Sequence, residues 1–383
     1  MLKLQNNLFL FSLLTLTFQS FAIKLFNSRY DLSSLILLLL LVCSFLNRNI
    51  TLKNFGLYIT LFFYQIIILI INFDNNYLHR YISAIGWLSL MYFLITGELK
   101  YTIKQKNIYR IIIFSSFIQA FYILFQFYFL DIIRPKGLFS EPSSAGLMLF
   151  ATCFAYLASS LLKNHKYSIL FLIFVLLGGF LTRSIHVFTN LIFFILILIY
   201  LRKHIGFKIN KIFIIVLITL ISTIFILNNQ YILSRITFEE LNLSQIIWIR
   251  GFEQALVSIK KSYIFGLGVG STGLFEFETI FFDKLQNMKM YELNIFDSYS
   301  LFNRLIIELG FLITFIFLIY FWKRFKINFN INKIDENSRY HYFNKIFSFF
   351  LILGCLIKEP LYANSLLLVS LFLFFNKEIN KNE

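Results

Sequence analysis

The chain has 383 residues, of which 58% are hydrophobic and 51 are phenylalanine, and its mean hydropathy is +0.75. This composition excludes a soluble globular class and indicates an integral membrane protein. The formal net charge is +16. Because the basic residues are spread over many short loops, the charge is typical of segments beside an anionic leaflet, and we expect no nucleic-acid partner.

A helix needs about 20 mostly apolar residues to cross the hydrocarbon core. Such stretches predict an all-α polytopic fold with about twelve spans, near 8–26, 32–46, 55–73, 79–96, 108–130, 142–162, 168–182, 185–201, 212–228, 299–321, 343–357 and 361–376. The chain thus divides into helices over 1–228, a long polar loop over 229–298, further helices over 299–376 and a tail over 377–383. We expect no cleavable signal peptide, because the first apolar run lacks a basic start and a small-residue cleavage site.

With the N-terminus inside, the inner segments hold most of the lysine and arginine, so the long loop is predicted to be extracytoplasmic and the tail cytoplasmic. Arginine is relatively enriched outside, at Arg29, Arg80, Arg134, Arg183, Arg235, Arg250 and Arg304. Guanidinium groups bind phosphate oxygens in a bidentate fork, so the outer arginines favour a phosphate or diphosphate partner. The alternative for each is that it lies at the lipid headgroups.

Cysteine chemistry is not predicted to contribute. Cys43, Cys153 and Cys355 fall in separate apolar spans, without metal-ligand spacing or an obvious partner. Neither disulfides nor a zinc site are therefore expected.

The first polar constellation is the segment 134–146, which joins two predicted spans and holds Pro135, Gly137, Pro142 and Gly146. Irregular backbone of this kind is tolerated at a membrane boundary where protein encloses it. Pro142 is well placed to start the next helix, with Glu141 near the positive end of its dipole. Arg134, Lys136 and Glu141 are the candidate functional residues, and a capped tight loop is the alternative.

A second polar site lies at the short joint 181–186, which turns one span into the next with almost no loop. It holds Arg183, Ser184 and His186 at the outer boundary. For His186, a hydrogen-bonded role at a helix interface and a role as a base both stand as alternatives.

The third constellation covers 248–270. Ile249, Phe252, Leu256 and Ile259 recur at helical spacing, which predicts an amphipathic helix along the membrane surface with Arg250, Glu253 and Lys261 on its other face. Gly266, Gly268 and Gly270 follow and can bring backbone N–H groups near a phosphate. The formal GxGxxG match of 268–273 is not a dinucleotide motif, because no strand precedes it and no βαβ unit surrounds it.

The last constellation is 297–310, which runs into an apolar helix. Arg304 and Glu308 are spaced i, i+4, so they either pair within the membrane or act in function. The first turns of this helix are predicted to end at Gly310.

These motifs resemble those of the O-antigen and capsular polysaccharide polymerases, which are related to the O-antigen ligases. The segment from Arg134 to Ser143 follows the pattern R-x-x-G-x-F-x-E-P-S, and Arg250 to Gly266 fits Arg-x15-Gly in one large outer loop. Ligases carry a histidine near the end of that loop, whereas residues 229–297 hold none. The resemblance therefore favours polymerase over ligase.

The resemblance implies a glycosyltransferase of lipopolysaccharide or capsule biosynthesis in the inner membrane, with an undecaprenyl-diphosphate-linked oligosaccharide as substrate and no cofactor or metal. Arg250 and Arg134 are assigned to the donor diphosphate and Glu141 to the acceptor hydroxyl. The further substrate-binding candidates are Lys136, Arg183, Ser184, Gly266, Gly268, Gly270 and Arg304. A chain-length regulator and a flippase are the protein partners that such a polymerase implies.

Three alternatives stay open: a ligase, a flippase or transporter, and a non-catalytic assembly partner. A flippase should line a central cavity with charge, and an ion-coupled transporter needs acidic residues or broken helices near mid-membrane. Here the spans are almost free of charge away from their outer ends.

Overall fold

The structure is a computed structural model of the chain. It describes residues 2–16, 22–25, 28–32, 34–39, 50–51, 55–72, 74, 77–96, 98–99, 104–163, 168–184, 186–201, 243–262, 264–275, 280–290, 298–328, 338–358, 362 and 364–375. The predicted span 212–228, Cys43 and Arg235 lie outside these residues.

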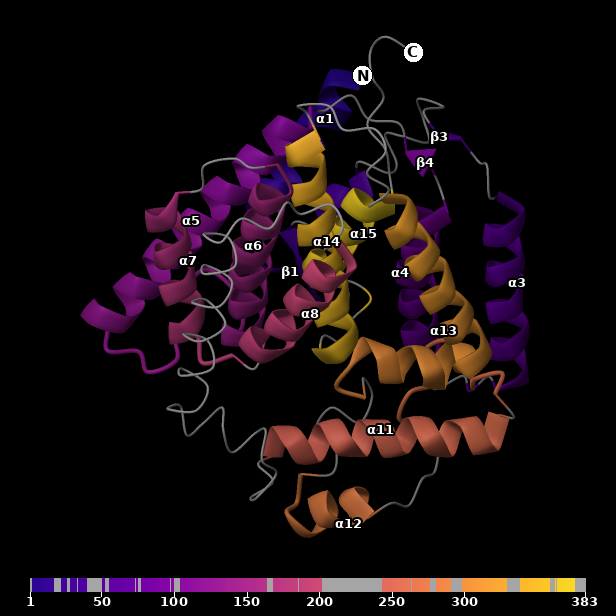
Figure 1. Cartoon of the computed structure of the whole chain (residues 1–383). Coiled ribbons are helices and arrows are strands. Elements are labelled where there is room, and N and C mark those ends of the chain that lie inside the picture. The colour runs from indigo at the N-terminus through magenta and orange to yellow at the C-terminus, as the bar shows by residue number, and fades with distance from the viewer. Residues whose placement is uncertain are drawn as a thin grey trace.

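The described part of the chain is predominantly helical (Figure 1). Its helices are α1 (Leu2–Thr15), α3 (Phe55–Ile71), α4 (Leu78–Thr96), α5 (Gln105–Phe129), α6 (Pro142–Lys163), α7 (Ile169–Leu181), α8 (His186–Leu201), α11 (Leu243–Ser262), α12 (Ile280–Asn287), α13 (Leu301–Asn328), α14 (Ser338–Lys358) and α15 (Ser365–Phe375). Two short antiparallel strand pairs join β1 (Ala22–Leu25) to β2 (Ser28–Asp31) and β3 (Ile50–Thr51) to β4 (Glu98–Leu99).

Five helices of the described residues are long and apolar enough to cross a membrane: Leu78–Ile95, Gln105–Phe129, Pro142–Ser160, Leu301–Lys326 and Arg339–Lys358. Shorter apolar helices cover Asn6–Thr15, Tyr58–Ile71, Ile169–Leu181, Thr189–Tyr200 and Ser365–Phe375. The structure therefore agrees with a helical membrane protein. It differs from the prediction over 8–26, because α1 ends at Thr15 and Ala22–Leu25 is a strand whose backbone pairs with β2.

The core is centred on α6, whose apolar window is 100% buried, whereas that of α5 is 39% buried. Helices α5, α7, α8 and α14 surround α6. Aromatic rings fill the contacts: the Phe154 centroid lies 4.9 Å from that of Phe194 on α8 and 6.1 Å from that of Phe350 on α14. In addition, Ser116 and Thr152 join α5 to α6 by a 2.8 Å hydrogen bond between hydroxyls.

Large apolar side chains also cover the outer side of α5 and α7. Exposed residues on these helices are Phe114, Phe117, Phe121, Phe125, Ile169, Leu170, Ile173 and Leu177. Many large exposed apolar side chains on neighbouring helices are typical of a lipid-facing side in a chain with helices that could span a membrane.

Helix α13 is interrupted at Gly310, which has φ 87° and ψ 160°. Before this residue the helix lies along α11, crosswise to the bundle, and after it the helix runs with the bundle (Figure 1). The prediction that the first turns end at Gly310 is therefore confirmed. Helix α11, predicted as amphipathic, lies across the same end of the bundle, with α12 beyond it (Figure 1).

The C-terminal end of α15 is held by polar side chains from neighbouring helices. Lys345, on α14, donates from Nζ to the carbonyl oxygen of Phe374 at 2.9 Å, and Asn328 donates to the same oxygen at 3.0 Å. Cations near the last carbonyls of a helix interact favourably with its dipole, which explains why a lysine is buried among apolar helices.

Candidate functional site

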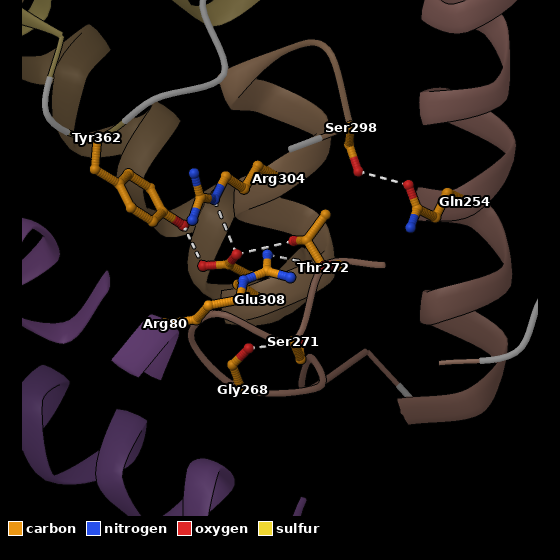
Figure 2. Close-up of polar contacts among 9 residues, drawn as sticks. All are labelled: Arg80, Gln254, Gly268, Ser271, Thr272, Ser298, Arg304, Glu308 and Tyr362. Carbon is orange, nitrogen blue, oxygen red and sulfur yellow. Dashed lines mark hydrogen bonds and ion pairs between the residues drawn. The ribbon is translucent and has the colours of Figure 1, made fainter. Parts of the chain in front are cut away.

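A buried cluster of polar side chains surrounds Glu308, near the kink of α13 (Figure 2). Arg304 lies one turn earlier on the same face of α13, and its Nε donates to Glu308 Oε1 at 2.9 Å. Of the two alternatives for these residues, the structure shows the i, i+4 ion pair, and a role in function stays a prediction. The exposed fraction is 8% for Arg304 and 0% for Glu308, so both charges are removed from solvent.

Two neutral side chains also donate hydrogen bonds to the Glu308 carboxylate. Thr272 Oγ1 donates to Glu308 Oε1 at 2.8 Å, and the Tyr362 hydroxyl donates to Glu308 Oε2 at 2.9 Å. Both oxygens of Glu308 therefore accept hydrogen bonds. Ionic groups are costly to bury unless they are paired and hydrogen-bonded, and Glu308 has both an ion pair and neutral hydrogen-bond donors.

A second guanidinium lies beside the pair. Arg80, in the first turn of α4, donates from Nη2 to the Thr272 carbonyl oxygen at 3.3 Å and is close enough for its charge to act on Glu308. Figure 2 shows this guanidinium next to the carboxylate. The cluster thus assembles two cations and one anion from α4 and α13, and the loop after α11 adds the neutral Thr272. Arg80 was identified only as one of several outer arginines, and Thr272 and Tyr362 were missed.

Close backbone packing fixes the cluster in place. The Leu267 N–H donates to the Ile307 carbonyl oxygen at 2.8 Å, and the Gly268 N–H donates to the Glu308 carbonyl oxygen at 3.1 Å. A Cβ at either Gly266 or Gly310 would overlap the backbone of the other segment. The glycine loop, residues 266–270, therefore packs against the kink of α13. Because the helix is interrupted at Gly310, the carbonyl oxygens of Ile307 and Glu308 accept hydrogen bonds from this loop.

This packing bears on the proposed phosphate role of the glycines. The Gly266 N–H donates to Ser262 Oγ at 3.1 Å, so two of the three predicted glycines direct their N–H groups to protein acceptors. Gly270 lies against Tyr81 of α4. The glycines thus have a packing role, and phosphate binding by them stays a prediction.

Arg250 is among the largest fully buried side chains of the described residues, on the face of α11 that packs against α13. One turn later, Gln254 Oε1 accepts from Ser298 Oγ at 2.7 Å (Figure 2). The opposite face carries Phe252 and Leu256, which are 44% and 46% exposed. The opposite placement of Arg250 and of Phe252 with Leu256 agrees with the prediction. The prediction does not hold at the end of the helix, where Lys261 is exposed and Ile259 packs against Ile306 and Ile307 of α13.

The segment around Arg134 is held by two buried glutamines of α5. Gln126 Oε1 accepts from the N–H groups of Lys136 and Gly137, at 3.1 and 2.8 Å. Gln119 Oε1 accepts from the Leu138 N–H at 3.1 Å, and Gly137 has φ 63°. These glutamines were missed, although their spacing of seven residues on an otherwise apolar helix is a signal that could have identified them.

The side chains of this segment lie in different environments. Arg134 is half-buried, whereas Lys136 and Glu141 are exposed. Glu141 Oε2 accepts from Ser143 Oγ at 3.0 Å at the start of α6, which begins at Pro142 as predicted.

The tight joint between α7 and α8 is present. Arg183 has φ 50° and is half-buried, while Ser184 Oγ accepts from the His186 N–H at 3.3 Å. Ser184 packs against Gly146 of α6, where a Cβ would overlap it. The joint is thus fixed to the segment that follows Arg134.

Among the described residues, no group of three or more histidine, cysteine, aspartate and glutamate side chains is placed to hold a metal ion. The chemistry available to the Glu308 cluster is that of its guanidinium groups, which are suited to binding phosphate oxygens.

A scan against protein-family models finds none that matches the chain, and a search of curated proteins finds no significant match.

Proposed function

We propose that the chain is an O-antigen or capsular polysaccharide polymerase. It would transfer a growing glycan from undecaprenyl diphosphate to the terminal sugar hydroxyl of a lipid-linked repeat unit. The observation that carries this proposal is the convergence of Arg80 and Arg304 on Glu308, beside the loop that follows an amphipathic helix. A fixed guanidinium cluster at the end of a membrane bundle suits a diphosphate leaving group.

The topology in this proposal has about twelve spans, with the end of the bundle that carries α11 facing outside the inner membrane. The large loop would then hold α11 against the membrane surface. Its exposed apolar residues Trp248, Phe252 and Leu256 recur every fourth position, which supports contact with lipid on that face.

The reaction would proceed by displacement at a sugar carbon. The acceptor hydroxyl oxygen forms a bond to the anomeric carbon of the donor, and the bond from that carbon to the diphosphate oxygen breaks. The diphosphate leaves with the electron pair, while the hydroxyl proton passes to a base. Guanidinium groups stabilise the charge that develops on the leaving group.

The assignments follow from burial and contacts. Arg80 and Arg304 bind the diphosphate, and Glu308 is a positioning residue that orients Arg304. Arg134 and Arg250 remain candidates for binding the same diphosphate. The exposed Glu141 is the candidate that orients or deprotonates the acceptor hydroxyl. Supporting roles in substrate binding stay with Lys136, Arg183, Ser184, Gly266, Gly268 and Gly270. A flippase that supplies the lipid-linked repeat and a chain-length regulator are the protein partners.

The test is the surface glycan profile of a deletion strain complemented with wild type or Arg80→Ala. We use Arg80 because it is only half-buried, and Lys260→Ala on the exposed side of α11 is the control. The expected result at equal membrane levels is a full ladder for wild type and Lys260→Ala, and glycolipid with a single repeat unit for Arg80→Ala.

Other profiles of the deletion strain would overturn the proposal. Bare lipid core with long lipid-linked chains accumulating inside would identify a ligase. An unchanged ladder would exclude a role in polymerisation and favour the alternative that the chain is a transporter.

A further inference from the structure

Two polar side chains lie buried at the start of α8. His186 and Asn190 are one turn apart, and each is 0% exposed. Both imidazole nitrogens and both carboxamide atoms lack a hydrogen-bond partner among the described residues. Buried polar atoms in folded proteins almost always have partners, so four adjacent exceptions call for a binding role.

The two side chains face the interior of the bundle. Phe194, one turn after Asn190 on the same face of α8, has its ring centroid 4.9 Å from that of Phe154 on α6. At the helix start, Lys358 of α14 is close enough for its charge to act on the His186 imidazole. The pair is thus placed between α6, α8 and α14, at the end where α14 finishes.

The chemistry of these groups selects the ligand. An inorganic anion needs donors only, and it would face the carboxamide oxygen and the acceptor nitrogen of a neutral imidazole. A metal ion needs acceptors only, and the ammonium of Lys358 opposes it. A hydroxyl group both donates and accepts, which matches one imidazole and one carboxamide.

We propose that His186 and Asn190 form a subsite for the hydroxyl groups of a neutral sugar. This inference rests on the proposed function, because it makes the pair a part of the glycan-binding region of the same enzyme. Lys358 approaches the pair, and Tyr362, four residues later, donates to Glu308. The Cα atoms of Lys358 and Tyr362 are at most about 14 Å apart, so the segment beside His186 and the segment that reaches the guanidinium cluster are neighbours along the chain.

The proposal is tested by sugar binding to the full chain in lipid nanodiscs. The protein has five histidines, so histidine-selective 15N labelling gives few imidazole signals, and His186→Gln assigns the one of interest. Wild-type protein is titrated with a panel of methyl glycosides of neutral hexoses, and separately with inorganic phosphate. The expected result is a saturable shift of the His186 signal with at least one glycoside and none with phosphate.

Asn190→Leu, of similar volume, should abolish the glycoside shift while the other imidazole signals stay in place. A shift with phosphate alone would overturn the proposal in favour of an anion site, and the absence of any shift would make the pair structural. The titration itself uses wild-type protein, and the variants serve to assign the His186 signal and to test Asn190. It also reports binding independently of the ladder, so loss of the polymerase proposal and loss of the sugar subsite are separate outcomes.

Discussion

The guanidinium of Arg304 lies over the ring of Tyr362, 4.4 Å from the ring centroid, while both side chains donate to the same carboxylate. Arg304 comes from α13, and Tyr362 lies between α14 and α15. The contact therefore fixes the crosswise part of α13 to the end of the bundle, and a cation over an aromatic face adds about 0.5–2 kcal/mol.

Removal of the central charge should destabilise the protein. In Glu308→Gln, the Arg304 guanidinium stays buried without its ionic partner, and breaking a buried pair costs about 3–5 kcal/mol. We expect a clear drop in the midpoint of thermal unfolding, followed by circular dichroism in detergent. Glu141→Gln is the matched control, because this exposed carboxylate should change the stability by less than about 0.5 kcal/mol. Equal midpoints for both variants would contradict the structural role of Glu308.

Gly310→Ala should disrupt the contact between α13 and the glycine loop. Gly310 has φ 87°, and a Cβ there would overlap the backbone of Ile264 to Gly266. The comparison is Gly86→Ala within α4, where a Cβ would meet nothing within 4 Å and helix propensity predicts a gain of about 1 kcal/mol. Size-exclusion profiles of the detergent-solubilised variants should show loss of the folded peak for Gly310→Ala only. A folded, equally stable Gly310→Ala protein would show that the kink is not required.

The apolar face of α11 should contact lipid. Trp248 is one of three tryptophans, so replacement of Trp87 and Trp322 by phenylalanine leaves it as the only fluorophore of its kind. We expect brominated lipids to quench its emission, most strongly when the bromine lies near the headgroups, because an interfacial helix is buried about 5–10 Å. Quenching by an aqueous quencher alone would place this face in water.

The turn after Arg134 should depend on Gln126. Gln126→Leu leaves the N–H groups of Lys136 and Gly137 without their acceptor, and each buried group that loses its partner costs about 1–3 kcal/mol. Amide hydrogen exchange over 130–141 should become faster. Lys136→Gln is the control, because its exposed side chain takes no part in these bonds. Unchanged exchange in Gln126→Leu would mean that the turn is held by other contacts.

Polymer formation should respond to charge and shape at Arg304. Arg304→Lys keeps the charge but loses the planar fork and the Nε donor, so transition-state stabilisation should fall by about 2–4 kcal/mol if this group binds the diphosphate. The ladder should shorten or disappear while the protein stays in the membrane. Normal chain lengths in Arg304→Lys would remove Arg304 from the diphosphate site.

The sequence was informative where a signal is local. Hydropathy predicted the helices that are long and apolar, and Pro142 predicted the start of α6. The spacing of Arg304 and Glu308 offered their pairing as one of two alternatives, and the ion pair is present. The partners Thr272 and Tyr362 could not be predicted, because they reach Glu308 from segments 36 and 54 residues away. Only tertiary packing brings such groups together, and the spacing of residues in the sequence does not predict these long-range contacts.

Hydropathy also combines two differently directed parts of α13 in one apolar window. The apolar window on α13 covers Leu301–Lys326, yet the helix changes direction at Gly310. Only the part from Phe311 to Asn328 runs with the bundle, and at 1.5 Å per residue it is about 27 Å long, close to the thickness of the hydrocarbon core. Arg304 and Glu308 therefore precede the part of α13 that runs with the bundle, while its basic residues Lys323, Arg324 and Lys326 lie in the last turns. The charges of α13 thus lie at the two ends of an uncharged apolar segment, Phe311–Trp322.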